Sequence, residues 1–177
     1  CFFNDTATTE IDSRSRHDAW PIWVPWRRMA LMVQKEVADR VQSPPGPKAY
    51  GILTVKLAFW WKLVERFEVP ASCFTPRPQV DAAVLVFEPL PADQTPSPEL
   101  WKGLSPFIDA AFGQRRKMLV NGLAARWPGF PGKEECRGAL SRLGFTESVR
   151  GECLSPDQFR RLYDLLSRPP DSAPAER

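Results

Sequence analysis

The stretch MALMVQKEVADRV, residues 29–41, indicates the fold class of this 177-residue chain. Residues 29–33 form an unbroken apolar run, a pattern typical of a strand buried on both faces of a parallel sheet. Polar residues then open a short helix over residues 35–41. A strand that passes directly into a helix is the unit from which α/β sheets are built, so we expect an α/β fold.

The sequence beyond this stretch continues the same pattern. The segment SPPGP at residues 43–47 interrupts the chain, because proline removes a backbone donor and glycine permits tight turning. Apolar residues at three- and four-residue spacing predict a second helix over residues 48–64. A short strand containing Phe67 and Val69 follows, and after a loop comes another apolar run at residues 82–87. The order strand, helix, helix, strand, loop, strand is that expected for the tail of an α/β sheet.

Beyond a proline-rich linker at residues 89–98 the pattern becomes helical. One helix is expected over residues 98–127, with its apolar side chains on one face. Another is expected over residues 133–143, where Gly144 supplies a C-terminal stop. Ser155, followed by proline and three residues on by glutamine, predicts the cap of a last helix.

These patterns divide the credible chain into two parts. Residues 29–90 are expected to form a partial α/β domain, and residues 97–168 a small all-α domain. Residues 169–177 are polar and rich in proline, so we expect a disordered tail.

The first segment of the chain follows none of these patterns. Residues 1–28 are interpreted as artefactual or disordered, because residues 1–22 lack a helical period, a strand alternation and a cap. Residues 4–22 resemble translated sequencing-adapter read-through, and such scars are set aside before the fold is considered. A disordered native terminus is the alternative. The single histidine, His17, lies in this segment and is assigned no role.

The composition excludes several classes of function. The formal net charge is only +3, but residues 97–168 hold twelve Lys or Arg against eight Asp or Glu, so the positive excess lies in the helical part. The four cysteines form no C-x-x-C pair, which argues against zinc or disulfides and fits reduced thiols in the cytoplasm. The sequence contains no run of about 18 apolar residues, so no membrane-spanning helix is predicted.

The first candidate site is the segment FTPRPQV, residues 74–80. Two prolines hold its backbone open, which would present Phe74 as a fixed aromatic surface beside a sheet edge. An exposed aromatic ring on a rigid loop suits stacking on a flipped-out base. The alternative is that Phe74 packs beneath the loop.

The second candidate site is the segment AFGQRRKMLVNGL, residues 111–123. If this segment is helical, Gln114, Lys117 and Asn121 share one face. Consecutive cations beside amide donors suit a phosphate backbone. The alternative is an ordinary solvated helix face.

The third candidate site is the polar run Gln34, Lys35 and Glu36 at the end of the first strand. Open α/β sheets bind ligands beyond the carboxyl ends of their strands. Helix-opening polar residues are the alternative interpretation.

Four stretches together resemble the KsgA-type ribosomal RNA adenine dimethyltransferases, in the same order along the chain. They are LMVQKEVADRV, KAYGILTV, FEVPASCFTPRPQVDAAVLVF and AFGQRRKMLVNGL. The resemblance implies a doubly wound, S-adenosylmethionine-dependent methyltransferase sheet followed by a small helical domain. It also implies an enzyme of ribosome biogenesis that transfers two methyl groups to adjacent adenines of small-subunit rRNA. We expect this enzyme to be a cytoplasmic monomer and to need no metal ion.

The resemblance also assigns site residues. Phe74 and Pro76 are expected to contact the target base. RNA contacts are expected from Lys35, Arg77, Gln114, Arg115, Arg116 and Lys117.

The pattern of this family is only partly present in the chain. Its Gly-rich cofactor loop, its ribose-binding acid and its Asn-Leu-Pro-Tyr motif would all precede residue 29, so no catalytic or cofactor-binding residue is assigned, and the chain alone is expected to be inactive. Ala82 stands where serine is usual. Gly113 stands where asparagine is common, and in a helix interior it would cost about 1 kcal/mol.

Two other readings remain open. A large-subunit rRNA adenine methyltransferase of the antibiotic-resistance type shares the proline loop, but the basic helix speaks against it. A non-catalytic RNA-binding remnant would lack the cofactor half, but half a sheet exposes unpaired strand edges.

Overall fold

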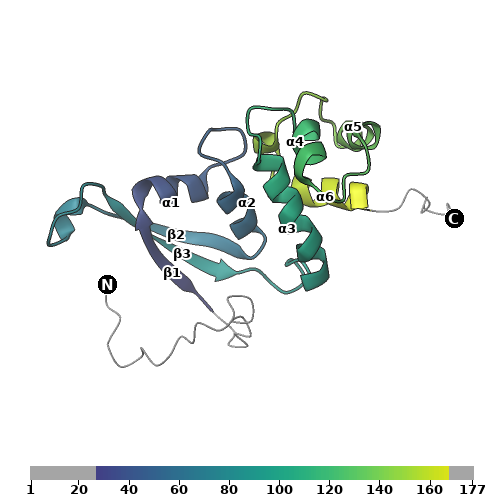
Figure 1. Ribbon diagram of the computed structural model, residues 1–177. Helices are drawn as coiled ribbons and strands as arrows, with labels where there is room; N and C mark the ends of the chain where they lie inside the picture. Colours follow the sequence, from purple (N-terminus) through teal and green to yellow (C-terminus); the bar gives the residue numbers. More distant parts are fainter. Residues whose placement is uncertain (1–26, 168–177) are drawn as a thin grey trace, which may run out of the picture.

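The structure is a computed structural model and describes residues 27–167. The predictions for residues 1–22, His17 and residues 169–177 lie outside this range. The described part contains a sheet with two helices on one face and a group of helices beyond one end of it (Figure 1). The elements are, in order, β1 (Met29–Gln34), α1 (Lys35–Gln42), α2 (Ile52–Ala58), β2 (Trp61–Val69), η1 (Ala71–Cys73), β3 (Ala82–Pro89), α3 (Pro98–Phe112), α4 (Leu119–Arg126), α5 (Lys133–Arg142), η2 (Gly151–Cys153) and α6 (Pro156–Ser167).

The expected order of elements in the α/β part is confirmed, but the pairing of its first strand differs from the prediction. The sheet has the order β1-β3-β2, and β3 runs antiparallel to both neighbours. The expectation of parallel pairing for residues 29–33 is therefore wrong within the described sheet. The reason lies in the chain path, because β3 returns from β2 and inserts between the two strands that run parallel to each other.

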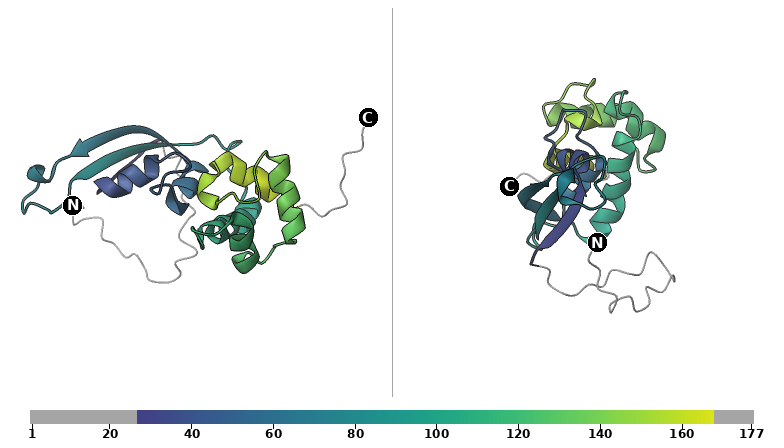
Figure 2. Two further views of the ribbon diagram at one scale, coloured as in Figure 1. Left: turned by 90° about the horizontal axis from the view of Figure 1, so that it is seen from above. Right: turned by 90° about the vertical axis from the view of Figure 1, so that its left-hand side faces the viewer.

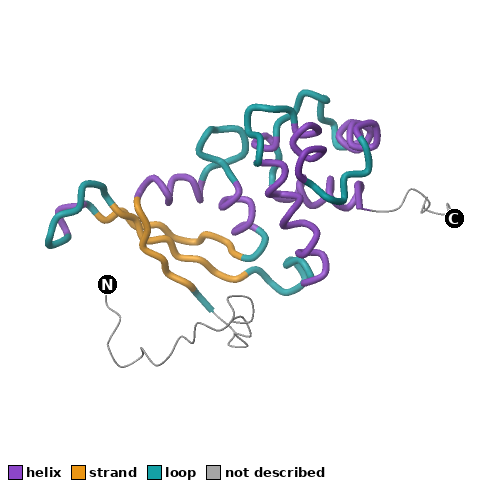
Figure 3. Tube along the Cα trace, in the orientation of Figure 1, coloured by secondary structure: helices purple, strands orange, loops and turns teal. Residues whose placement is uncertain are grey.

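The burial expected for β1 is also wrong among the described residues. The side chains of Leu31 and Met32 are 42% and 52% exposed. Strand β1 is an edge of the described sheet and pairs only with β3. Helices α1 and α2 cover one face of the sheet, whereas no described element covers the face that carries Met32 and Phe67 (Figure 3). Ala38 of α1 is buried against Ala83, Leu85 and Phe87 of β3 in one cluster.

The helix predicted over residues 48–64 is shorter than expected at both ends, because α2 begins only at Ile52. Helix α2 stops at Ala58, and β2 begins at Trp61. The spacing of the apolar residues is compatible with a helix, but residues 61–69 are rich in aromatic and branched side chains that pair along β3 from Pro89 to Ala82. Cross-strand pairing therefore overrides a short-range helical pattern.

The single helix predicted over residues 98–127 is broken in the middle. Helix α3 ends at Phe112, and α4 begins at Leu119, whose N–H donates to the carbonyl of Val149 at 2.8 Å. Gly113 is the C-cap of α3, so the expected cost of a glycine inside a helix does not arise. The side chain of Arg126 lies over this glycine, where a Cβ atom would come within 2.6 Å of its Cδ.

The last two helices confirm the sequence prediction. Helix α5 ends at Arg142, and Gly144 adopts a φ of 79°, a conformation that glycine reaches at no steric cost. The N–H of Gln158 donates to Ser155 Oγ at 3.2 Å, and the N–H of Ser155 donates to Gln158 Oε1 at 2.8 Å. This reciprocal pair is a capping box that fixes the start of α6.

The main hydrophobic core reaches from the helical part into the first half of the chain. Tyr50, Val55 and Phe59 are buried in the same cluster as the apolar faces of α3–α6. The ring of Trp101 in α3 also meets Phe59 edge-on at 5.9 Å. Helix α2 therefore joins the sheet to the helical part, which lies beyond one end of the sheet while the β2–β3 loop projects from the other (Figure 2).

None of the helices within residues 27–167 combines the length and the apolarity that a membrane span requires. Within the same residues, His, Cys, Asp and Glu side chains form no group of three that could hold a metal ion.

Candidate functional site

The loop between β2 and β3, residues 70–81, is fixed at its base by one carboxylate. The N–H of Ala71 donates to Asp81 Oδ1 at 2.8 Å, which ties the two ends of the loop together. The carbonyl of Asp81 accepts from the N–H of Lys35 at 3.0 Å, which ties the loop to the junction of β1 and α1. The loop can therefore project from the sheet and still keep a fixed direction.

The predicted base-contacting residues lie on this loop. Phe74 is half-buried, and its N–H donates to the carbonyl of Ala71 at 3.3 Å. Pro76 and Arg77 are exposed, and the Thr75–Pro76 peptide bond is cis. Phe74 is therefore held at its backbone and is only partly covered by the rest of the protein.

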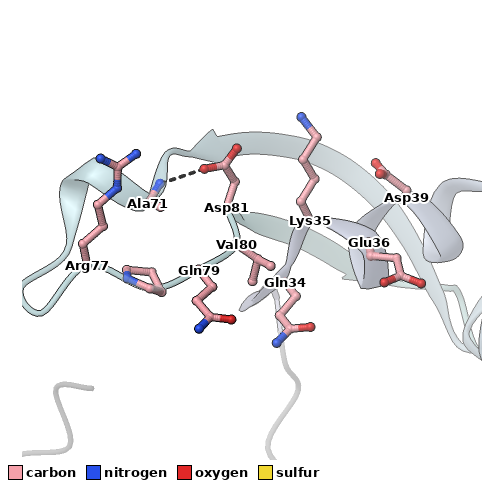
Figure 4. Close-up of a pocket in the computed structure, with 10 residues that line it drawn as sticks. Gln34, Lys35, Glu36, Asp39, Ala71, Arg77, Gln79, Val80 and Asp81 are labelled. Carbon is pink, nitrogen blue, oxygen red and sulfur yellow. Dashed lines mark hydrogen bonds between the residues drawn. The ribbon is translucent and has the colours of Figure 1, made fainter.

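A cavity of about 640 Å³ lies at the base of the loop, with side chains from both the loop and the β1–α1 junction around it (Figure 4). The amide groups of Gln34 and Gln79 point to the same side, whereas Lys35 points to the opposite side. The residues around the cavity are Gln34, Lys35, Glu36, Asp39, Ala71, Arg77, Pro78, Gln79, Val80 and Asp81. The lining has three carboxylates and two cations, so the cavity does not suit a phosphate group. The amides of Gln34 and Gln79 can both donate and accept hydrogen bonds, so they are the groups best suited to bind a ligand there.

The structure brings the predicted residues Lys35 and Arg77 to the same cavity, but Lys35 is already paired. Its Nζ lies 3.2 Å from Glu68 Oε2. Hydrogen bonds from Lys35 and then from Arg66 hold the pKa of the Glu68 carboxyl below its usual value. Arg66 in turn donates to Asp39 at 2.7 Å, so this ionic network joins β2 to α1.

The other predicted RNA contacts lie in the turn between α3 and α4. The N–H of Lys117 donates to the carbonyl of Gln114 at 2.8 Å, and residues 113–118 are not helical. The shared helical face expected for Gln114, Lys117 and Asn121 is therefore not formed. Arg116 and Lys117 are exposed at this turn.

Arg115 differs from its neighbours because its guanidinium is directed at the protein. Its Nη2 donates to the carbonyls of Lys48 and Tyr50, both at 2.8 Å, and lies 3.3 Å from Glu152 Oε2. Ion pairs in this region, within residues 27–167, join Arg115 and Arg150 to Glu152 and do not include Arg116.

Sequence reasoning missed Asp81 and Tyr50 as structural determinants of the site. Asp81 could have been found, because an aspartate at the end of a loop commonly accepts a backbone N–H. Tyr50 could not, because its hydroxyl donates to the carbonyl of Leu154, 104 residues away, at 2.7 Å.

The described residues share the fold of rRNA methyltransferases. A dimethyladenosine transferase from Plasmodium falciparum superposes with a TM-score of 0.63 at 22% identity, covering 77% of this chain and 56% of that one. The 23S rRNA methyltransferase ErmE superposes with a TM-score of 0.57 at 19% identity, covering 80% and 55%. The predicted fold class, a methyltransferase-type α/β sheet followed by helices, is confirmed.

The chain belongs to the ribosomal RNA adenine dimethylase family, which residues 23–167 match. The proteins named ribosomal RNA small subunit methyltransferase A from Chlamydia felis and Chlamydia abortus are 39% and 42% identical to it over 145 and 147 residues, covering 80% and 81% of this chain. The protein of the same name from Lachnoclostridium phytofermentans is 38% identical over 146 residues, covering 81%. The chain spans about half the length of these relatives, with shares of 48%, 50% and 49%. The family resemblance seen in the sequence is thereby confirmed.

Proposed function

We propose that this chain is the portion of an rRNA adenine dimethyltransferase that presents the target base and contacts the RNA. The whole enzyme would transfer two methyl groups from S-adenosylmethionine to the exocyclic nitrogens of adjacent adenines in small-subunit rRNA. Membership of the family and the names of the relatives support this assignment. We further propose that the enzyme acts as a cytoplasmic monomer on the immature small subunit.

The observation that carries the proposal is the half-buried Phe74 on a loop fixed at its base. The residue is partly exposed, and the loop is held through Asp81 at both of its ends and at the β1–α1 junction. A base that leaves its helix needs a rigid partner, and stacking on an aromatic side chain contributes about 1–3 kcal/mol. Pro76 would limit the space on one side of the stacked base.

The exposed cations provide the second element of the proposal. Arg116 and Lys117 in the α3–α4 turn, with Gln114 beside them, would contact phosphates and fix the RNA in register. Arg77 would contact RNA beside the target base. Lys35 would contact RNA while its ammonium group remains paired with Glu68.

S-adenosylmethionine does not fit the residues that the structure describes. Strand β1 passes into α1 at Lys35 without an intervening loop, so no Gly-rich turn stands at that strand end to receive the cofactor. The cavity at Gln34 and Gln79 has a mixed charge and no glycine in its wall. We therefore expect the 177-residue chain to bind no S-adenosylmethionine in calorimetry, and tight binding would contradict this assignment.

The proposed function is tested with a synthetic RNA hairpin of small-subunit rRNA that carries two adjacent adenines in its loop. Phe74→Leu keeps an apolar side chain but removes the ring, and it should weaken binding about fivefold or more, as expected for loss of stacking. Phe74→Tyr is the matched control and should bind like the unchanged chain. Equal binding by the Leu and Tyr variants would contradict the base-contact assignment.

The same assay separates the rival functions. Preference for a large-subunit rRNA hairpin would favour the large-subunit alternative, and the 23S rRNA methyltransferase ErmE shares the fold of the described residues. Tight binding that ignores the adenines, with no effect of Phe74→Leu, would favour a non-catalytic RNA-binding protein.

A further inference from the structure

Arg115 lies at a junction between the basic turn and the segment that connects α1 to α2. Its Nη2 donates to two main-chain carbonyls of that segment, those of Lys48 and Tyr50, at 2.8 Å each. A guanidinium that donates to uncharged carbonyls holds backbone in place and is not available through those hydrogens to a phosphate. The side chain is 41% exposed, so this contact stands at the surface of the junction.

Three further contacts join these two segments to η2 and to Leu154, the residue that follows it. The N–H of Gly46 donates to the carbonyl of Glu152 at 2.8 Å. The hydroxyl of Tyr50, whose residue is 1% exposed, donates to the carbonyl of Leu154 at 2.7 Å. The carboxylate of Glu152 lies 3.3 Å from Arg115 Nη2 and orients the guanidinium. Residues 46–50, the turn at 113–118 and η2 therefore form one fastened junction.

The neighbouring cations are arranged differently. Arg116 and Lys117 are exposed and project from the turn that Arg115 fastens. The turn lies between the end of α3 and the start of α4, outside regular structure, and within it the N–H of Lys117 donates to the carbonyl of Gln114. Two adjacent arginines thus have different environments, one bonded to the protein and one open to solvent.

We propose that Arg115 is a positioning residue that fastens the basic turn to residues 46–50, so that Arg116 and Lys117 meet RNA in a preset geometry. This inference rests on the proposed function, because it assumes that the turn contacts RNA. It assigns the two arginines to separate tasks, with Arg115 ordering the contact surface and Arg116 making the phosphate contact. Preorganisation of a binding surface raises affinity by reducing the ordering that binding requires.

The two arginines form a matched pair for the test, since Arg115→Gln and Arg116→Gln remove the same charge one residue apart. The affinity of the full 177-residue chain for the small-subunit hairpin is measured over a range of salt concentrations, below the thermal transition of each variant. Arg116→Gln should reduce the slope of log K against log salt by about 0.7–0.9, the value for one lost phosphate contact. Arg115→Gln should keep the slope and lower the affinity roughly tenfold at every salt concentration, because about two hydrogen bonds that order the turn are lost. A slope change equal to that of Arg116→Gln, or an unchanged affinity, would overturn the proposal.

A milder variant keeps the proposal testable if Arg115→Gln does not fold. Glu152→Gln removes a negative charge, so electrostatics alone would raise the affinity for RNA. A weakened junction would instead lower that affinity. We expect about twofold weaker binding, since a charge-assisted hydrogen bond is replaced by a neutral one. Glu147→Gln removes the same charge from a residue that pairs with Arg137 away from the junction, and it should bind RNA as well or slightly better. Tighter binding by Glu152→Gln would refute the assignment.

Hydrogen exchange in the absence of RNA separates this inference from the proposed function. Arg115→Gln should speed amide exchange about tenfold in peptides that cover residues 43–50, and it should leave the exchange rates in α5 unchanged. Arg116→Gln should leave the exchange rates of both regions unchanged. A wild-type chain that fails to bind the hairpin would contradict the proposed function, whereas unchanged exchange at residues 43–50 would contradict the fastening role of Arg115.

Discussion

Replacement of Tyr50 by phenylalanine removes a single oxygen atom from the centre of the junction. The Tyr50 hydroxyl donates to the carbonyl of Leu154 at 2.7 Å, and both residues are buried, at 1% and 0% exposure. The ring itself packs against Phe112 with centroids 6.0 Å apart, a contact that phenylalanine preserves. The variant therefore isolates one buried hydrogen bond.

The expected loss of stability follows from the acceptor that is left behind. The Leu154 carbonyl lies outside the helices and accepts from Tyr50 alone among the bonds of the described residues. A buried acceptor without a partner costs about 1–3 kcal/mol, so we expect the free energy of unfolding to fall by about 2 kcal/mol. For a chain of this size that corresponds to a decrease in Tm of about 4–8 °C.

The pH dependence of the same variant provides a second measurement. Burial raises the pKa of the Tyr50 hydroxyl above its usual value. The protonated phenol is thus favoured in the folded state, and its contribution is complete below the unfolded pKa of about 10 and is lost as the pH rises above it. The stability difference between the chain and its Tyr50→Phe variant should therefore narrow above about pH 10.

The assay is thermal and urea unfolding followed by circular dichroism, with Tyr163→Phe as the matched control. Tyr163 is only half-buried, and its hydroxyl has no hydrogen-bond partner among the bonds found within residues 27–167, so loss of that oxygen should change Tm by less than 2 °C or so. If the two variants lose equal stability, or if the difference is independent of pH between 8 and 11 or so, the reasoning from the Leu154 carbonyl fails.

Three further predictions concern other elements of the fold. Ser155→Ala removes the capping box of α6 and should cost about 1 kcal/mol in urea unfolding, whereas Ser141→Ala on the exposed face of α5 should cost little. Burial raises the pKa of the Cys136 thiol to about 11, so iodoacetamide should label the exposed Cys73 and Cys153 first, and early labelling of Cys136 by mass spectrometry would contradict this. Gly113→Ala should change stability by less than about 1 kcal/mol, because only the flexible side chain of Arg126 must move, whereas Gly151→Ala should lose about 1–3 kcal/mol, since its Cβ would lie 2.7 Å from the Ala111 carbonyl oxygen.

The parts of the fold that the sequence predicts correctly are those that depend on neighbouring residues. The cap at Ser155 and the stop at Gly144 need only three or four residues to be recognised, and both are present as expected. The strand predicted from the apolar run at residues 82–87 is likewise confirmed as β3. A short apolar segment bounded by turn residues is typical of a buried strand.

The two incorrect helix predictions both involve pairing with a distant segment. Trp60 and Trp61 fit the periodicity of a helix, but Trp61 begins β2 and pairs with Pro89 of β3. Residues 113–118 fit the continuation of α3, but the N–H of Leu119 donates to the carbonyl of Val149 and starts a new helix in a different direction. Neither partner is visible in the local pattern, because each lies about 30 residues away along the chain.

The candidate site shows the same division at the level of single residues. The loop carrying Phe74 is recognisable from its prolines, because they restrict the backbone wherever they occur. Arg115 and Arg116 are chemically identical in the sequence, and only the carbonyls of Lys48 and Tyr50, 67 and 65 residues away, distinguish them. A basic run therefore predicts that a turn contacts an anion, but it does not predict which cation holds the turn.

The junction at Arg115 is significant because of where it stands between the two contact surfaces. The loop with Phe74 projects from one end of the sheet, and the basic turn belongs to the helices beyond the other end (Figure 2). An RNA can contact both surfaces at once only if the distance between them matches its own geometry. That distance is set by how the helical part is attached to the sheet. The attachment runs through residues 46–50 and α2, whose Lys56 also pairs with Asp109 of α3 at 2.8 Å. Loosening this attachment should therefore reduce the coupling between base stacking and phosphate contact. In the unchanged chain, the double variant Phe74→Leu with Arg116→Gln should lose less binding free energy than the sum of the two single losses, because each single variant already loses the coupling. The losses should become additive when Arg115 is also replaced by Gln.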